Sequence, residues 1–130
     1  MFFKSVSLKT MQMGKLGHAL SDIGLSFSSS EKGADGTIRL MTASWNMGNA
    51  AAEGLQELIP NKGGDFDIIV LGLQESTYTT NSIMTSCVTE LQDSIIAILG
   101  VDWMRLKAAK RAQMQVLIYV TKAIRGRVSR

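Results

Sequence analysis

The chain has 130 residues, of which 45% are hydrophobic and 19% are charged. It is long enough for one globular domain and too apolar for a disordered chain. A single cysteine excludes an internal disulfide, and the lack of any apolar run near ~18 residues excludes a membrane-spanning helix. We therefore expect a protein of a reducing compartment, the cytoplasm, with no transmembrane segment.

Charge is divided unevenly along the chain, although the net charge is only +3. Residues 1–102 hold six Lys or Arg and eleven Asp or Glu, a balance of −5, whereas residues 103–130 hold eight Lys or Arg and no acid, a balance of +8. This asymmetry predicts either an anionic partner for the basic segment or an incomplete domain whose missing half carries the compensating acids.

Residues 1–36 are interpreted as an N-terminal extension. The apolar residues between Met11 and Ile23 are spaced to form one face of a helix. Residues 26–36, SFSSSEKGADG, are rich in serine and glycine, which is typical of a flexible linker. We place the start of the folded core at about Thr37, so that residues 37–130 form the expected domain.

Two apolar runs, Thr37–Asn46 (TIRLMTASWN) and Phe66–Glu75 (FDIIVLGLQE), are each interpreted as a strand that ends at a polar side chain. Between them, residues 50–59 predict a short helix with one apolar face, which Pro60 ends. Strand, helix and strand then form one crossover unit, whose two strands are parallel neighbours in a sheet.

Asn46 and Glu75 thereby fall at the same edge of the predicted sheet, where the carboxyl ends of parallel strands form sites in α/β folds. An amide oxygen and a carboxylate are hard ligands, and Mg²⁺ suits such a pair because it retains several waters or phosphate oxygens. On these residues alone, a purely structural role for the pair is an equally good interpretation.

The stretch 81–99 carries apolar residues at helical spacing. Thr80 or Asn81 is the expected N-cap of this helix, and Gly100 its end. Cys87 falls on the apolar stripe, so we interpret it as a small buried hydrophobe rather than as a reactive thiol.

Two further strands are predicted at residues 102–110 and 113–121, with a basic connection, AAKRAQ, between them. The last residues are strongly basic and begin another strand at Val128. The chain is therefore expected to stop within a fold rather than at its end.

Two short blocks, IRLMTASWNMGNA at residues 38–50 and DIIVLGLQE at residues 67–75, closely resemble the opening motifs of the inositol polyphosphate 5-phosphatases. These enzymes belong to the endonuclease/exonuclease/phosphatase superfamily. The resemblance covers residues 37–130 and implies an α/β (α+β) fold, namely part of a four-layer α/β/β/α sandwich.

The same resemblance assigns roles to individual side chains. Asn46 and Glu75 would help to bind the catalytic Mg²⁺, and both count as catalytic residues by family. Gln74 would be a hydrogen-bonding partner behind them, and Trp45 would pack beneath the site. Gln115 departs from the basic residue that the family usually carries there.

The later motifs of that family do not occur in this sequence: the GNKG loop after the strand at 113–121, the GDLNYR-like strand end and the SDHRPV-like motif. The only histidine, His18, precedes the first core strand and cannot match the catalytic histidine of the family. The resemblance therefore implies an N-terminal portion of a catalytic domain, with an incomplete catalytic set and negligible activity on its own.

The expected function by family is Mg²⁺-dependent hydrolysis of the 5-phosphate from phosphoinositides or inositol polyphosphates. One alternative is a nuclease of the same superfamily, although the Gly48-Asn49 loop argues against it and we expect no nucleic-acid partner. The other is a non-catalytic module that binds anionic lipid through residues 103–130, which would place the protein peripherally at membranes.

Overall fold

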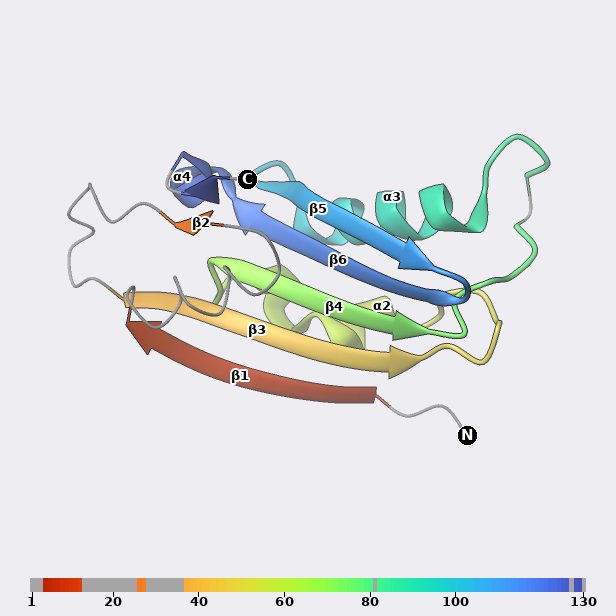
Figure 1. The fold of residues 1–130 in the computed structure, drawn as a ribbon, viewed down its shortest axis with the longest axis horizontal. Coiled ribbons are helices and arrows are strands. Elements are labelled where there is room, and N and C mark those ends of the chain that lie inside the picture. Colours follow the sequence, from red (N-terminus) through yellow and green to blue (C-terminus); the bar gives the residue numbers. More distant parts are fainter. Residues whose placement is uncertain (1–3, 13–25, 28–36, 81, 127, 130) are drawn as a thin grey trace.

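The computed structural model describes residues 4–12, 26–27, 37–80, 82–126 and 128–129. They form a mixed α/β (α+β) fold, in which short helices pack on a twisted mixed sheet (Figure 1). In chain order the elements are β1 (Lys4–Gln12), β2 (Ser26–Phe27), β3 (Thr37–Asn46), α2 (Leu55–Leu58), the 3₁₀ helix η1 (Pro60–Gly63), β4 (Ile68–Gln74), α3 (Cys87–Leu99), β5 (Trp103–Arg111), β6 (Met114–Thr121), α4 (Lys122–Arg125) and β7 (Val128–Ser129).

The main sheet has five strands in the order β1-β3-β4-β6-β5, and β2 pairs with β7 in a separate two-stranded sheet. Strands β3 and β4 are parallel, whereas the other neighbours in the main sheet are antiparallel. The predicted crossover unit with two parallel strands is therefore confirmed.

Strand β1 corrects the expected start of the folded core. It pairs with β3 along its whole length, from Lys4 opposite Trp45 to Gln12 opposite Thr37, so the sheet begins well before Thr37. The helix face expected between Met11 and Ile23, and the linker expected at residues 26–36, fall outside the described residues except where β1 and β2 occupy them.

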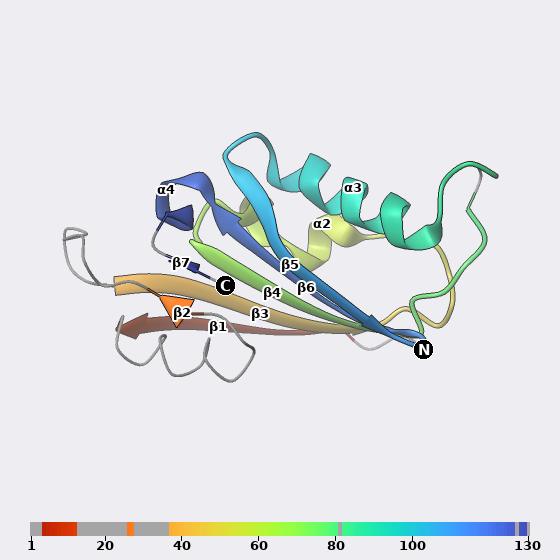
Figure 2. The same cartoon turned by 45° about the horizontal axis from the view of Figure 1, so that its top comes forward.

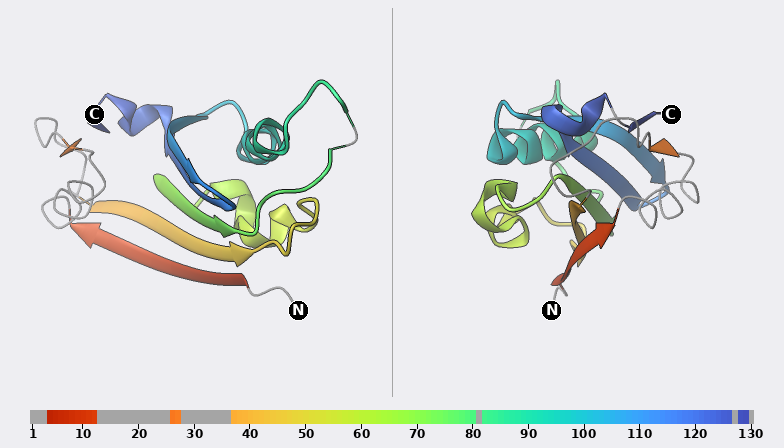
Figure 3. Two further views of the ribbon diagram at one scale, coloured as in Figure 1. Left: turned by 45° about the vertical axis from the view of Figure 1, so that its right-hand side comes forward. Right: turned by 90° about the vertical axis from the view of Figure 1, so that its left-hand side faces the viewer.

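One face of the sheet is covered by α2 and α3 (Figures 2 and 3). Alternate side chains of the central strands point to this face and are buried against the two helices. The main members of this core are Met41, Ala43, Trp45, Leu55, Leu58, Ile69, Leu71, Leu73, Leu91, Ile95, Leu99, Trp103, Leu117 and Tyr119. Burial of so many apolar side chains is the main stabilising contribution to the fold.

The described residues cover the opposite face only in part. Its buried cluster lies at the amino ends of β3 and β4, where Ile124 of α4 packs on it. The other members are Ile38, Leu40, Ile68, Leu106, Ile118 and Val120. Toward the carboxyl ends of β3 and β4 the same face is polar or open, because Ser44 is exposed and Val116 is 44% exposed.

Two helix boundaries differ from the prediction. Helix α3 begins after Ser86, whose Oγ accepts a hydrogen bond from the Thr89 amide at 3.2 Å, and not after Thr80 or Asn81. Thr80 Oγ1 instead bonds to the carbonyl oxygen of Thr85, 2.8 Å away, and stabilises the loop before the helix. Cys87 at the first turn is half-buried.

The connection between β3 and β4 is also less helical than expected. Helix α2 covers Leu55–Leu58 rather than residues 50–59. Pro60 follows it at the first position of η1. A proline is tolerated there because the N–H at the first position of a helix has no acceptor within the helix.

The two strands predicted at residues 102–110 and 113–121 are present as β5 and β6, which pair in an antiparallel hairpin. The stretch expected to connect them is mostly strand, because β5 continues to Arg111 and only Ala112 and Gln113 form the turn. Within the described residues, no helix is long and apolar enough to cross a membrane.

Candidate functional site

Asn46 and Glu75 meet at the carboxyl ends of β3 and β4. The two strands are in register with Asn46 opposite Gln74, so the residue after Gln74 lies beside the Asn46 side chain. Asn46 Nδ2 donates a hydrogen bond to Glu75 Oε1 at 2.9 Å. The predicted juxtaposition of the two side chains is thus present in the structure.

Both ends of the Asn46 carboxamide are held. Its Nδ2 donates to Glu75, and its Oδ1 accepts from the Gly48 amide at 2.9 Å. The Met47 amide donates to the Gln74 carbonyl at 2.9 Å, which continues the pairing of β3 and β4 by one residue. An amide oxygen has two lone pairs, so Asn46 Oδ1 can accept from Gly48 and still coordinate a cation.

Glu75 has an unusual backbone conformation. Its φ is 48°, in the left-handed region that a residue with a β-carbon adopts at a cost of roughly 1 kcal/mol. The Asn49 amide holds it there by donating to the Glu75 carbonyl at 2.7 Å. With its carboxamide oriented to suit its neighbours, Asn49 also donates from its side chain to the carbonyls of Glu75 and Thr77, each at 3.1 Å.

Glu75 shares its positive φ with Asn49, Asn61, Lys62 and Ala112, so this conformation alone does not identify a site. Strain of this kind persists only where surrounding contacts enforce it, and it is concentrated at functional sites. Here it turns the chain sharply out of β4 and leaves the Glu75 side chain exposed beside Asn46. The sequence contained no signal for this conformation, because glutamate is not a residue that usually marks a left-handed turn.

Gln74 lies opposite Asn46 in the β3–β4 register, and its supporting role at the site stays a prediction. Its Nε2 donates to Ser44 Oγ at 3.0 Å across the β3–β4 pair. Its contribution to the site comes through its carbonyl, which accepts from Met47. Trp45 points to the other face of β3 and is 4% exposed in the helix-covered core, so it supports the strand end from below.

A second anchor ties the segment after Glu75 to the β5–β6 hairpin. The amide and Oγ of Ser76 both bond to the Gln113 carbonyl, each at 3.0 Å. Gln115 Nε2 donates to Ser76 Oγ at 2.9 Å, and both side chains are buried, at 2% and 0% exposed. Sequence reasoning did not predict this contact, although a glutamine in place of a basic residue at 115 marked the position as unusual.

The chemistry of the pair fits a hard divalent cation. In the described part of the chain, no group of three His, Cys, Asp or Glu side chains that could hold a metal ion is present, so a cation at this edge would have few protein ligands. A carboxylate next to an amide oxygen at an open sheet edge suits Mg²⁺, which binds through one or two protein groups and keeps several waters.

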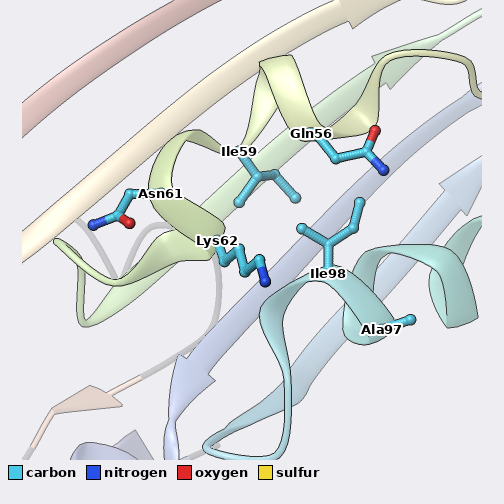
Figure 4. A pocket seen from close by; sticks show the side chains of 6 residues that line it. All are labelled: Gln56, Ile59, Asn61, Lys62, Ala97 and Ile98. Carbon is cyan, nitrogen blue, oxygen red and sulfur yellow. The ribbon is translucent and has the colours of Figure 1, made fainter.

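A sizeable hollow lies elsewhere in the described structure. It is a groove of about 640 Å³ between α3 and the α2–η1 segment (Figure 4). Its lining side chains are Gln56, Ile59, Asn61, Lys62, Ala97 and Ile98. Neither Asn46 nor Glu75 lines it, so the candidate site is an open edge rather than a closed pocket.

Comparison with known proteins adds no relative. No protein-family model, curated protein or solved structure matches the chain. The functional interpretation therefore depends on the two motifs and on the geometry that they adopt at the sheet edge.

Proposed function

We propose that Asn46 and Glu75 bind Mg²⁺, and that the chain forms the N-terminal part of a phosphatase domain that hydrolyses the 5-phosphate of phosphoinositides or inositol polyphosphates. The observation that carries the proposal is the 2.9 Å contact between Asn46 and Glu75 at the shared carboxyl edge of β3 and β4. Asn46 lies within the first of the two motifs that resemble this family, and Glu75 ends the second.

The residues of this chain have distinct roles in the proposed site. Glu75 supplies the negative charge, and Asn46 supplies a neutral oxygen and fixes the Glu75 carboxylate through its Nδ2. Asn49 maintains the turn that presents Glu75. When bound, Mg²⁺ neutralises phosphate charge and stabilises an in-line displacement at phosphorus.

The proposal includes the finer fold, a four-layer sandwich in which a second sheet stacks on this one. Two features support it. The helices α2 and α3 cover one face of the sheet, whereas the described residues cover the opposite face only in part and leave Ser44 exposed. An antiparallel partner sheet would bury that face.

The proposal also holds that this chain is inactive by itself. Hydrolysis of phosphate monoesters is among the slowest uncatalysed reactions, so a single metal-binding pair supplies only part of the needed acceleration. The general acid–base residue would come from outside these 130 residues.

Ligand binding tests the function without requiring turnover. Calorimetric titration with inositol 1,4,5-trisphosphate should show binding that depends on Mg²⁺ and exceeds that of inositol 1,4-bisphosphate, which lacks the 5-phosphate. Glu75→Gln should remove the Mg²⁺-dependent part, whereas Glu53→Gln, at an exposed glutamate before α2, should retain it.

Three results would contradict the proposal. If the trisphosphate binds equally well with and without Mg²⁺, or if the Glu53 and Glu75 variants behave alike, the metal site is wrong. Mg²⁺-dependent phosphate release by the chain alone would instead contradict the proposal that its catalytic set is incomplete.

A further inference from the structure

We propose that the tip of the β5–β6 hairpin, residues Lys110–Met114, is a docking surface for anionic phospholipid membranes. All five residues of the tip are exposed. Two are cationic, Lys110 and Arg111, and Met114 is a large apolar side chain that is 52% exposed. Cations beside an exposed apolar side chain are the combination that binds the interface of an anionic bilayer.

The tip extends beyond the body of the sheet. Toward the turn, the pairing of β6 with β4 ends at Gln115, which lies opposite Leu73. The segment Lys110–Met114 therefore lies beyond the part of the hairpin that pairs with β4. Figure 1 shows the hairpin turn at the same end of the sheet as the arrowheads of β3 and β4.

A shallow, mostly apolar hollow of about 230 Å³ adjoins the tip. Lys110 and Arg111 border it, and Met114, Val116 and Ala109 supply its apolar lining. Arg111 pairs with Met114, and Ala109 with Val116, so these four side chains share one face of the hairpin. This arrangement suits an amphiphile with an anionic headgroup.

The charge of the surrounding segment complements such a surface. Residues 103–130 carry eight basic residues and no acid. Long-range attraction to an anionic bilayer would therefore concentrate the protein with this segment toward the membrane.

A membrane is favoured over a nucleic acid by the kind of side chains at the tip. Single-stranded nucleic acids are bound by aromatic side chains that stack on the bases. The only aromatic residues of β5 and β6 are Trp103 and Tyr119, which are 6% and 0% exposed. Met114 can enter the lipid interface but offers no stacking surface.

The position of the tip links docking to the proposed function. Ser76, which follows Glu75, bonds to the Gln113 carbonyl through both its amide and its Oγ. The tip and the Asn46–Glu75 pair are thus neighbours at one edge. This link rests on the proposed function, in which the Asn46–Glu75 pair acts on phosphorylated inositol lipids. Docking of the tip would then place lipid headgroups close to the pair.

Vesicle co-sedimentation of the full chain, without Mg²⁺, tests docking independently of the metal site. We expect binding to phosphatidylcholine vesicles containing phosphatidylserine and little binding to phosphatidylcholine alone. The Lys110→Gln/Arg111→Gln variant should bind roughly 30-fold more weakly, from about fivefold per basic residue near an anionic surface. Met114→Ser should also weaken binding.

Matched controls lie away from the tip. Lys62→Gln/Lys122→Gln removes the same charge from exposed positions in η1 and α4, and Val101→Ser changes a side chain that is 82% exposed at the far end of β5. Both controls should lose much less binding than the tip variants. Circular dichroism of each variant verifies that it is folded.

Three outcomes would overturn the proposal. Vesicle binding that does not depend on phosphatidylserine excludes an anionic membrane. Equal losses of binding in the tip and control variants would show that net charge, and not the tip, determines binding. Loss of oligonucleotide binding in the tip variant, with vesicle binding unchanged, would assign the tip to nucleic acid. Glu75→Gln should leave vesicle binding intact, so failure of the metal site and failure of docking are distinguishable.

Discussion

The substitution Asn46→Asp distinguishes a metal site from a purely structural hydrogen bond, because it replaces only the side-chain NH₂ group of Asn46 by an oxygen. It replaces the Nδ2 donor by an oxygen that faces Glu75 Oε1, 2.9 Å from the original nitrogen. The Oδ1 that accepts from the Gly48 amide is retained. Without a cation, the variant therefore places two carboxylates in contact. With a cation, it offers a more negative ligand pair.

The magnitude follows from this geometry. Two unit charges separated by 2.9 Å repel by about 1.4 kcal/mol in bulk water, and by more beside the half-buried Asn46. Loss of the hydrogen bond adds about 1 kcal/mol. We expect the free energy of unfolding at pH 7 to fall by about 2–4 kcal/mol, since the two carboxylates can move apart at the open edge.

Urea unfolding followed by tryptophan fluorescence measures this change. Both tryptophans, Trp45 and Trp103, are buried and report on the core. Excess Mg²⁺ should restore most of the lost stability, whereas NaCl at the same ionic strength should restore much less. If the variant is as stable as wild type, or if Mg²⁺ acts no better than NaCl, the account of this edge is wrong.

Three further predictions concern the fold. Leu71→Ala, in the centre of β4 and 0% exposed, should cost about 2–5 kcal/mol in urea unfolding, whereas Ile83→Ala, at a fully exposed side chain, should cost less than about 0.5 kcal/mol. Burial, opposed by Arg105 and reinforced by Asp93, raises the pKa of Tyr119 to about 12. The contribution of neutral Tyr119 to the free energy of unfolding should therefore be fully present below pH 10 and decline between pH 10 and 12. The decline should be smaller in Tyr119→Phe, a substitution that loses no hydrogen bond. Ser86→Ala should lower stability by about 1 kcal/mol and reduce helical circular dichroism, since it removes the cap of α3; an unchanged variant would exclude Ser86 as the cap.

Hydrophobic pattern was sufficient to predict the central elements. The uninterrupted apolar run in β4 identified a buried strand, and the helix predicted between β3 and β4 indicated a crossover unit with parallel strands. From that topology the meeting of Asn46 and Glu75 followed directly.

Other features were not predictable, for identifiable reasons. Strand β1, KSVSLKTMQ, is short of apolar residues, and its place at the edge of the sheet depends on pairing with β3 rather than on its own pattern. The start of α3 was misplaced because several Ser and Thr residues precede it, and only the structure shows which one caps the helix.

The local geometry of the site also could not be predicted from the sequence. The left-handed conformation of Glu75 is imposed by Asn49, from the loop after β3. The contact between Ser76 and Gln115 joins residues 39 positions apart. Both depend on the assembled sheet, so no local pattern encodes them.

The most direct test of the central claim is a Mg²⁺ titration followed by amide chemical shifts in ¹H–¹⁵N NMR spectra. The account predicts saturable shifts that are concentrated at the Asn46 side chain and the backbone amides of Gly48, Asn49 and Glu75, and that disappear in Glu75→Gln. Shifts that do not saturate, that spread over the acidic surface, or that persist in Glu75→Gln would contradict a metal site at this edge.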